Sequence, residues 1–109
     1  MSASETLSRI QTLVAHREVH ISSHGYDELE KDGIFVGETF SGAVDAILVE
    51  DYPSAGRGPS VLVLQKDRNG RPIHVVWGIP RGQDGPAVLV TAYRPDPAKW
   101  SVDFRKRKP

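Results

Sequence analysis

The sequence contains no cysteine, so disulfide bonds, iron–sulfur clusters and zinc sites built from thiolates are excluded. No apolar run approaches the ~18 residues that a helix needs to cross a bilayer, so no membrane partner is predicted. The first five residues lack the basic start and apolar stretch of a secretion signal. We therefore expect a cytoplasmic protein. Its 109 residues favour a single domain, residues 1–109, that is large enough to bury one hydrophobic core.

Net charge is also absent, with 14 basic and 14 acidic residues, but the charges are unevenly placed. Residues 1–56 hold ten acidic and three basic residues, a net of −7, and residues 57–109 carry the opposite net of +7. Such an asymmetry suggests that the second half meets a polyanion. The segment 95–109 is the densest basic part, although a short basic run is also compatible with a solvated chain end.

The first part of the chain, residues 1–49, is predicted to be helical. Ser4 is a candidate N-cap for a helix that carries Leu7, Ile10 and Val14 on one face. Ser22 or Ser23 begins a second helix that Gly33 ends, after a stretch from Val19 that is extended or a break. A third helix is predicted to carry four apolar residues on one face, namely Phe40, Val44, Ile47 and Leu48.

The second part, residues 60–94, is predicted to be an antiparallel sheet. Three apolar, β-branched runs, 61–64, 73–78 and 87–93, alternate with turn sequences that begin at Asp67 and at Pro80. Trp100 and Phe104 are expected to fold back onto this sheet. The predicted fold is α+β, with two or three N-terminal helices packed on a three- to four-stranded antiparallel sheet.

Three of the four histidines, His16, His20 and His24, are spaced by four, so a continuous helix would align them as metal ligands. The stretch around His20 is a poor helix, Ser22 and Ser23 resemble a cap, and no glutamate completes a zinc-protease motif. We therefore predict no metal site and no cofactor.

Side chains suited to phosphodiester chemistry fall on two predicted strands. His74 faces away from Ile73, Val75 and Trp77, as a residue of an alternating strand must. Thr91 and Tyr93 are predicted to share a face with Leu89 and to present two hydroxyls beside the cation of Arg94. A strand histidine more often belongs to a core, and a hydroxyl pair often only covers a sheet edge.

Six short motifs occur in order within residues 7–107. They are Ile21-Ser22-x-His24-Gly25, Asp32-Gly33-Ile34, Glu50-Asp51-Tyr52-Pro53, Arg71-Pro72-Ile73-His74-Val75-Val76, Thr91-Ala92-Tyr93-x-Pro95 and Trp100 to Arg105. Together they make the sequence resemble the DUF4258 family of small bacterial proteins. That family is grouped with the barnase, EndoU, colicin and RelE-like ribonucleases, so the resemblance implies helices against an antiparallel sheet. Acidic Glu28 and Asp32 stand where many members carry arginine.

The resemblance implies a metal-independent endoribonuclease. Because members of the family often resemble the toxins of toxin–antitoxin pairs, it also implies a partner, an antitoxin of the zinc-finger and helix-turn-helix type. RNA supplies its own nucleophile, the 2′-hydroxyl, so the enzyme needs only a base, an acid and cations. By position, His24 and His74 would exchange the proton, and Thr91 and Tyr93 would hold the phosphate. The cations expected to bind RNA are Lys66, Arg71, Arg94, Arg105, Lys106 and Arg107. The alternative is a non-catalytic module of the same fold that binds protein or nucleic acid.

Overall fold

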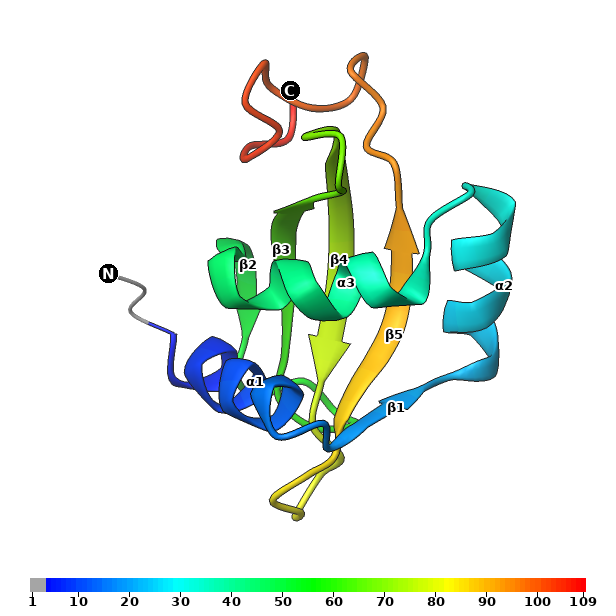
Figure 1. Cartoon of the computed structure of the whole chain (residues 1–109). Coiled ribbons are helices and arrows are strands. Elements are labelled where there is room, and N and C mark those ends of the chain that lie inside the picture. Colours follow the sequence, from blue (N-terminus) through cyan, green and yellow to red (C-terminus); the bar gives the residue numbers. More distant parts are fainter. Residues whose placement is uncertain (1–3) are drawn as a thin grey trace.

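The computed structural model describes residues 4–109 and folds the chain into helices on a mixed sheet (Figure 1). The elements follow one another as α1 (Glu5–Ala15), β1 (Val19–Ile21), α2 (Ser23–Lys31), α3 (Val36–Gly42), a 3₁₀ turn (Ala43–Asp45), β2 (Ile47–Tyr52), β3 (Ser60–Lys66), β4 (Pro72–Gly78) and β5 (Ala87–Tyr93). The predicted α+β class is therefore confirmed. Within residues 4–109, no helix is long and apolar enough to cross a membrane.

The sheet has five strands in the order β1-β5-β4-β3-β2, so the prediction of three or four antiparallel strands was wrong. Strands β2 to β5 pair antiparallel, as expected, but β1 pairs parallel with the start of β5, with Val19 opposite Ala87. The sheet thus extends beyond residues 60–94, because β1 and β2 come from the part predicted to be helical. Parallel pairing joins segments far apart in sequence, and a three-residue strand leaves little local signal.

The first two helices begin where their serine caps predict. The Ser4 hydroxyl accepts a hydrogen bond from Leu7 N at 3.1 Å, and the Ser22 hydroxyl accepts one from Gly25 N at 2.9 Å. Gly33 follows α2 with a φ of 64°, a left-handed conformation that glycine adopts without strain. Each cap satisfies a backbone donor that the first helical turn leaves free.

The third predicted helix is shorter than expected. Helix α3 ends at Gly42, and Ile47 and Leu48 belong to strand β2 instead of a helical face. The apolar residues from Phe40 to Leu48 fit a helical period, but short apolar runs fit buried strands equally well. Pairing with the long strand β3 decides between the two, since it satisfies the backbone of a β-branched segment.

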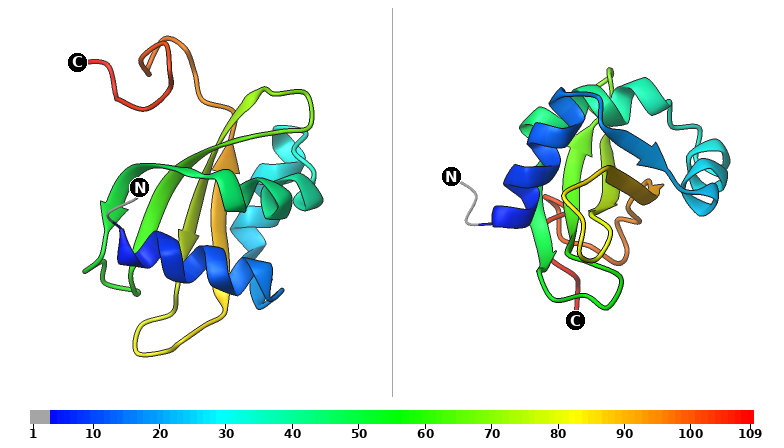
Figure 2. Two further views of the ribbon diagram at one scale, coloured as in Figure 1. Left: turned by 60° about the vertical axis from the view of Figure 1, so that its left-hand side comes forward. Right: turned by 90° about the horizontal axis from the view of Figure 1, so that it is seen from below.

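Different segments of the chain pack on the two faces of the sheet. Helices α1 and α3 lie on one face, and the C-terminal segment (residues 95–109) lies on the opposite side, as the view from below shows (Figure 2). Between the helices and the sheet, Leu7, Ile10, Ile73, Val75 and Trp77 are almost completely buried. The other face, called the outer face below, displays the alternate residues of the same strands.

Candidate functional site

The outer face brings together three of the four residues predicted to be catalytic. His74 on β4 lies directly opposite Tyr93 on β5, and Val76 lies opposite Thr91. The predicted alternation of His74 against Ile73, Val75 and Trp77 is confirmed, because those three residues pack in the core. The outer face also includes Glu50 of β2, which pairs with the outward residue Leu62.

Thr91 reaches the outer face because β5 contains an irregularity. The register shifts between Val76 and Trp77, which pair with Thr91 and Leu89, so Val90 is an extra residue on β5. Leu89 is consequently buried in the core with Trp77, and it does not share a face with Thr91 and Tyr93 as the period of two predicted. The bulge reverses the alternation for the second half of the strand.

His74 is completely buried, with 0% of its surface exposed. Its Nε2 lies 2.8 Å from the carbonyl oxygen of Phe104, and its Nδ1 lies 3.2 Å from the hydroxyl of Tyr93. Because a carbonyl only accepts, we assign the proton to Nε2, which leaves Nδ1 to accept from the Tyr93 hydroxyl. The edge of the ring also meets Trp100, with 4.4 Å between the ring centroids.

This environment holds both side chains of the pair in their neutral forms. Burial away from water lowers the pKa of His74, and the charge of Arg107 acts in the same direction, while the bond to Phe104 opposes them. Burial likewise raises the pKa of Tyr93, so its hydroxyl stays protonated and donates to His74. The pair therefore fixes the C-terminal segment and, as it stands, offers no imidazole to an external phosphate.

A buried neutral histidine makes stability depend on pH. The unfolded chain, with a histidine pKa of about 6.5, binds a proton that folded His74 resists, so the protein should lose stability as pH falls below that value. Between about pH 7.5 and about pH 5.5, His74→Gln should lose less than the wild type, by up to about 1.4 kcal/mol per pH unit. Urea unfolding at both pH values measures this difference.

His20→Gln is the matched control, because His20 is exposed on β1. It should keep the pH dependence of the wild type. An equal loss of stability in His74→Gln and in the wild type would mean that His74 is protonated as readily in the folded protein as in the unfolded chain.

The C-terminal segment is fastened over the outer face by a second set of contacts. Arg107 donates to both carboxylate oxygens of Glu50, at 2.9 Å from Nε and 3.0 Å from Nη2. Its guanidinium also lies over the Trp100 ring, 4.7 Å from the centroid. The hydrogen bond from Arg107 lowers the pKa of Glu50, so the carboxylate stays ionised. The prediction that Trp100 and Phe104 fold back onto the sheet is confirmed.

Two of the six cations predicted to bind RNA instead hold the fold together. Arg107 is occupied by Glu50, as above. Arg94 forms an ion pair with Asp67, with 3.1 Å between Nη1 and Oδ2, although its N–H is not aligned for a hydrogen bond. Asp67 is itself held by the backbone N–H groups of Arg71 and Asn69, which lower its pKa.

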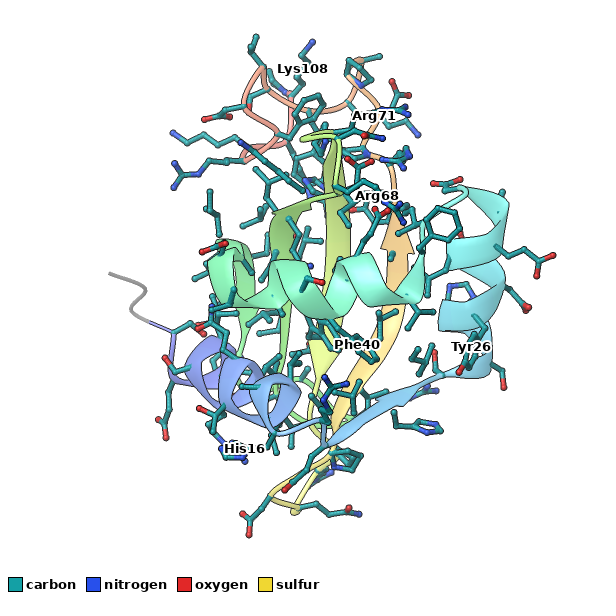
Figure 3. The ribbon with its side chains drawn as sticks, viewed as in Figure 1. His16, Tyr26, Phe40, Arg68, Arg71 and Lys108 are labelled. Carbon is teal, nitrogen blue, oxygen red and sulfur yellow. The ribbon has the colours of Figure 1, made fainter. Side chains whose placement is uncertain are left out.

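The four other cations predicted to bind RNA, Lys66, Arg71, Arg105 and Lys106, lie at one end of the molecule, where the β3–β4 hairpin meets the C-terminal segment. Figure 3 shows Arg68, Arg71 and Lys108 at this end and His16 at the other. Arg68 pairs with Glu38, and Arg105 lies beside Asp103. Five other cations at this end are exposed and form no ion pair with any residue in the range 4–109. They are Lys66, Arg71, Lys99, Lys106 and Lys108. We call these five residues, together with Arg105, the basic end.

His24 lies apart from the other predicted catalytic residues. It extends from the first turn of α2, its side chain is 65% exposed, and its Nε2 lies 4.0 Å from Glu28. No contact joins it to His74, whose ring partners all come from β5 and the C-terminal segment. The structure therefore does not bring the proposed proton couple together.

The three evenly spaced histidines also fall on three different elements. His16 is the C-cap of α1, His20 lies in β1 and His24 lies in α2. They share no helical face, and the part of the chain that the structure describes holds no cluster of three candidate metal ligands. The helix break inferred at Ser22 explains this separation.

Comparison with known protein families shows which family the sequence belongs to. The sequence model of a domain of unknown function, DUF4258, matches residues 21–94, well over half of the chain. The chain belongs to the DUF4258 family. No curated protein sequence and no solved structure matches it. The family prediction is confirmed, while the grouping of DUF4258 with the ribonuclease fold stays a prediction.

The matched region of this DUF4258 domain contains strands β2 to β5 but not the C-terminal segment that covers the outer face. It runs from the end of β1 to the residue after β5, and the C-terminal segment that seals His74 follows it. The sequence predicts that Trp100 folds back onto the sheet, but it does not indicate that His74 and Arg107 are its partners or that Glu50 binds Arg107. A lone carboxylate and a lone tryptophan carry no signal of a partner 57 or 26 residues away along the chain.

Proposed function

We propose that this DUF4258 domain binds single-stranded RNA, with the basic end contacting the phosphate backbone. The observation that supports this proposal most is that five exposed lysines and arginines at the basic end form no ion pair with any residue in the range 4–109. They come from the β3–β4 hairpin and the C-terminal segment, so the fold gathers charges that are scattered in sequence. Cations that neutralise phosphates release counterions, which is the main source of sequence-independent affinity.

The charge distribution of the whole chain agrees with a polyanion ligand. Most acidic residues of the first half belong to α1, α2, α3 and β2, whereas the basic end belongs to the second half. A ligand of phosphate groups is thereby attracted to one end and repelled from the helices. Exposed Tyr52, 47% accessible at the end of β2, and half-buried Tyr93 add aromatic surface to the outer face. Bases stack on such rings only when they are unpaired, which favours a single strand.

Wild-type binding should depend steeply on salt. Each phosphate neutralised on a single strand contributes about −0.7 to the slope of log affinity against log salt concentration. If the five unpaired cations of the basic end each contact a phosphate, the slope should approach −3.5. Fluorescence anisotropy with a labelled oligouridylate, measured over a series of salt concentrations, gives this slope. A protein that leaves the anisotropy of the RNA unchanged even at low salt would overturn the proposal.

Cleavage of the bound RNA is a second candidate function, and one observation favours it. On the outer face the Tyr93 hydroxyl lies 3.2 Å from His74 Nδ1, and Thr91 lies two residues before Tyr93 on the same face of β5. Transesterification also needs a base and an acid that reach the phosphate. His74 is sealed by Phe104 and Trp100, and His24 is elsewhere, so the geometry supports binding better than cleavage.

An assay for products separates the two functions. Labelled RNA incubated with the wild-type protein and a chelator should stay intact if the protein only binds it. Fragments ending in a 2′,3′-cyclic phosphate, lost in His74→Ala and His24→Ala variants that stay folded, would instead establish metal-independent cleavage.

A further inference from the structure

The outer face carries a groove beyond the reach of the C-terminal segment. It encloses about 540 Å³, within the ~300–1,000 Å³ range of small-molecule sites. Its floor is apolar and formed by β4 and β5, with Val76, Gly78, Val88 and Val90 among the lining residues. The β2–β3 loop forms a wall, from which Arg57 lines the groove.

Backbone features keep this groove open. Val90, the extra residue of the β5 bulge, is 38% exposed and lines the groove instead of packing in the core. A Cβ on Gly78 would make only ordinary contacts, at 3.6 Å to Pro59 O and 3.7 Å to Val90, so no neighbouring atom crowds the groove floor at this glycine. A Cβ on Gly58 would instead collide with Ile79 O, and its φ is +125°, so glycine there lets the loop approach β4.

The charge of the groove has one sign. Arg57 is the only charged residue among the described residues that line it, and no carboxylate of the range 4–109 forms an ion pair with it. Its backbone carbonyl accepts from Arg81 N at 3.0 Å, so the loop is fixed while the exposed guanidinium is available. The half-buried hydroxyl of Ser60 adds one polar group to the lining.

The groove also lies in line with the basic end on one face of the sheet. Val76 in the groove pairs with Thr91, and the next outward pair on the same two strands is His74 and Tyr93. Beyond them the C-terminal segment carries its cations. Since a strand advances about 3.3 Å per residue, the path from Val88 to Tyr93 is on the order of 16 Å, a distance that a few nucleotides can span.

We propose that this groove holds one unpaired nucleobase of the bound RNA, with Arg57 contacting the adjoining phosphate. The inference rests on the proposed RNA binding and adds to it the part of the ligand that is not phosphate. An apolar floor suits the face of a base, a single cation at the wall suits its phosphate, and the hydroxyl of Ser60 is a partner for the base edge. A purely apolar ligand would leave Arg57 without a partner.

The test compares an oligouridylate with an abasic RNA of the same length and charge. The wild type should bind the oligouridylate at least about fivefold more tightly, because only that RNA can bury a base in the groove. Val90→Trp, which fills the groove, should lose this preference and keep the affinity for abasic RNA. Val44→Trp is the matched control, since Val44 is 73% exposed in the 3₁₀ turn and does not line the groove.

A second variant tests the phosphate contact without filling the groove. Arg57→Ala should reduce the salt slope by about 0.7 and weaken the binding of both RNAs, whereas Arg9→Ala on α1 should do neither. Equal affinity of the wild type for both RNAs, with a steep salt slope, would overturn the base site and leave the proposed function standing. Failure of both RNAs to bind would overturn the two together. Binding of the base-containing RNA that Val90→Trp leaves unchanged would place the base elsewhere.

Discussion

Replacing Arg71, Lys106 and Lys108 with alanine is expected to lower the affinity for single-stranded RNA by about a hundredfold at about 0.1 M salt. The salt slope should fall by about 2, because three phosphate contacts of about 0.7 each are lost. All three side chains are exposed and have no ion-pair partner within residues 4–109, so their removal leaves no buried charge behind. Melting curves should therefore match the wild type.

A triple variant with the same change in charge is the control for this prediction. Arg9 lies on α1, Arg17 follows it, and Arg81 lies in the β4–β5 loop, away from the basic end. Arg9→Ala, Arg81→Ala and Arg17→Asn should change affinity little; asparagine suits position 17 because its φ is +60°. If both triple variants weaken binding equally, the effect belongs to net charge and the basic end is not the binding surface.

The cations show why charge counts alone do not locate a binding surface. Arg94 and Arg107 looked equivalent to their basic neighbours in the sequence. In the structure each faces a carboxylate, Asp67 and Glu50, supplied by a distant strand or turn. We expect their loss to loosen the C-terminal segment and the hairpin, not to remove phosphate contacts.

The parts of the fold that the sequence predicts correctly are those with local causes. The caps at Ser4 and Ser22, the left-handed Gly33 and the hairpin at Asp67 each depend on residues within a few positions. Strands β3, β4 and β5 carry enough β-branched residues to be recognised alone. Their alternation also placed His74 correctly on the face opposite Trp77.

The parts that could not be predicted depend on pairing across the chain. Strand β1 is too short to be recognised before β5 is known to lie beside it. Residues 47–49 fit a helical pattern in the sequence, but in the fold their backbone forms hydrogen bonds with β3. The bulge at Val90 reversed one face of β5, which separated Leu89 from Thr91 and created part of the groove.

For the same reason, the sequence predicts which residues meet in the candidate site but not that His74 is buried there. His74, Thr91 and Tyr93 meet because they lie on adjacent strands, and strand order follows from a meander. The burial of His74 depends on where Phe104 and Trp100 come to rest, 30 and 26 residues further on. His74, a residue suited to proton transfer, thereby holds the C-terminal segment instead. For this reason the geometry supports RNA binding better than RNA cleavage.

Trp77→Ala is expected to destabilise the fold by about 3–5 kcal/mol, a large part of the ~5–15 kcal/mol typical of a domain. Trp77 is completely buried beneath α3, where its ring lies 6.4 Å from that of Phe40. Its Nε1 donates to Gln65 Oε1 at 2.9 Å, and Gln65 Nε2 donates to Thr39 O at 2.9 Å, so one chain of bonds joins β4, β3 and α3. The substitution leaves a cavity and an unpaired amide oxygen together.

Two further variants separate the cavity from the hydrogen bond. Trp77→Phe keeps most of the buried surface but leaves Gln65 Oε1 without a donor, so it should cost less, about 1–3 kcal/mol. Tyr26→Ala removes an aromatic ring that is 55% exposed on α2, and it should change stability by less than about 0.5 kcal/mol. Urea unfolding of the three variants gives the comparison. A Trp77→Ala protein as stable as Tyr26→Ala would show that α3 is held to the sheet without this side chain.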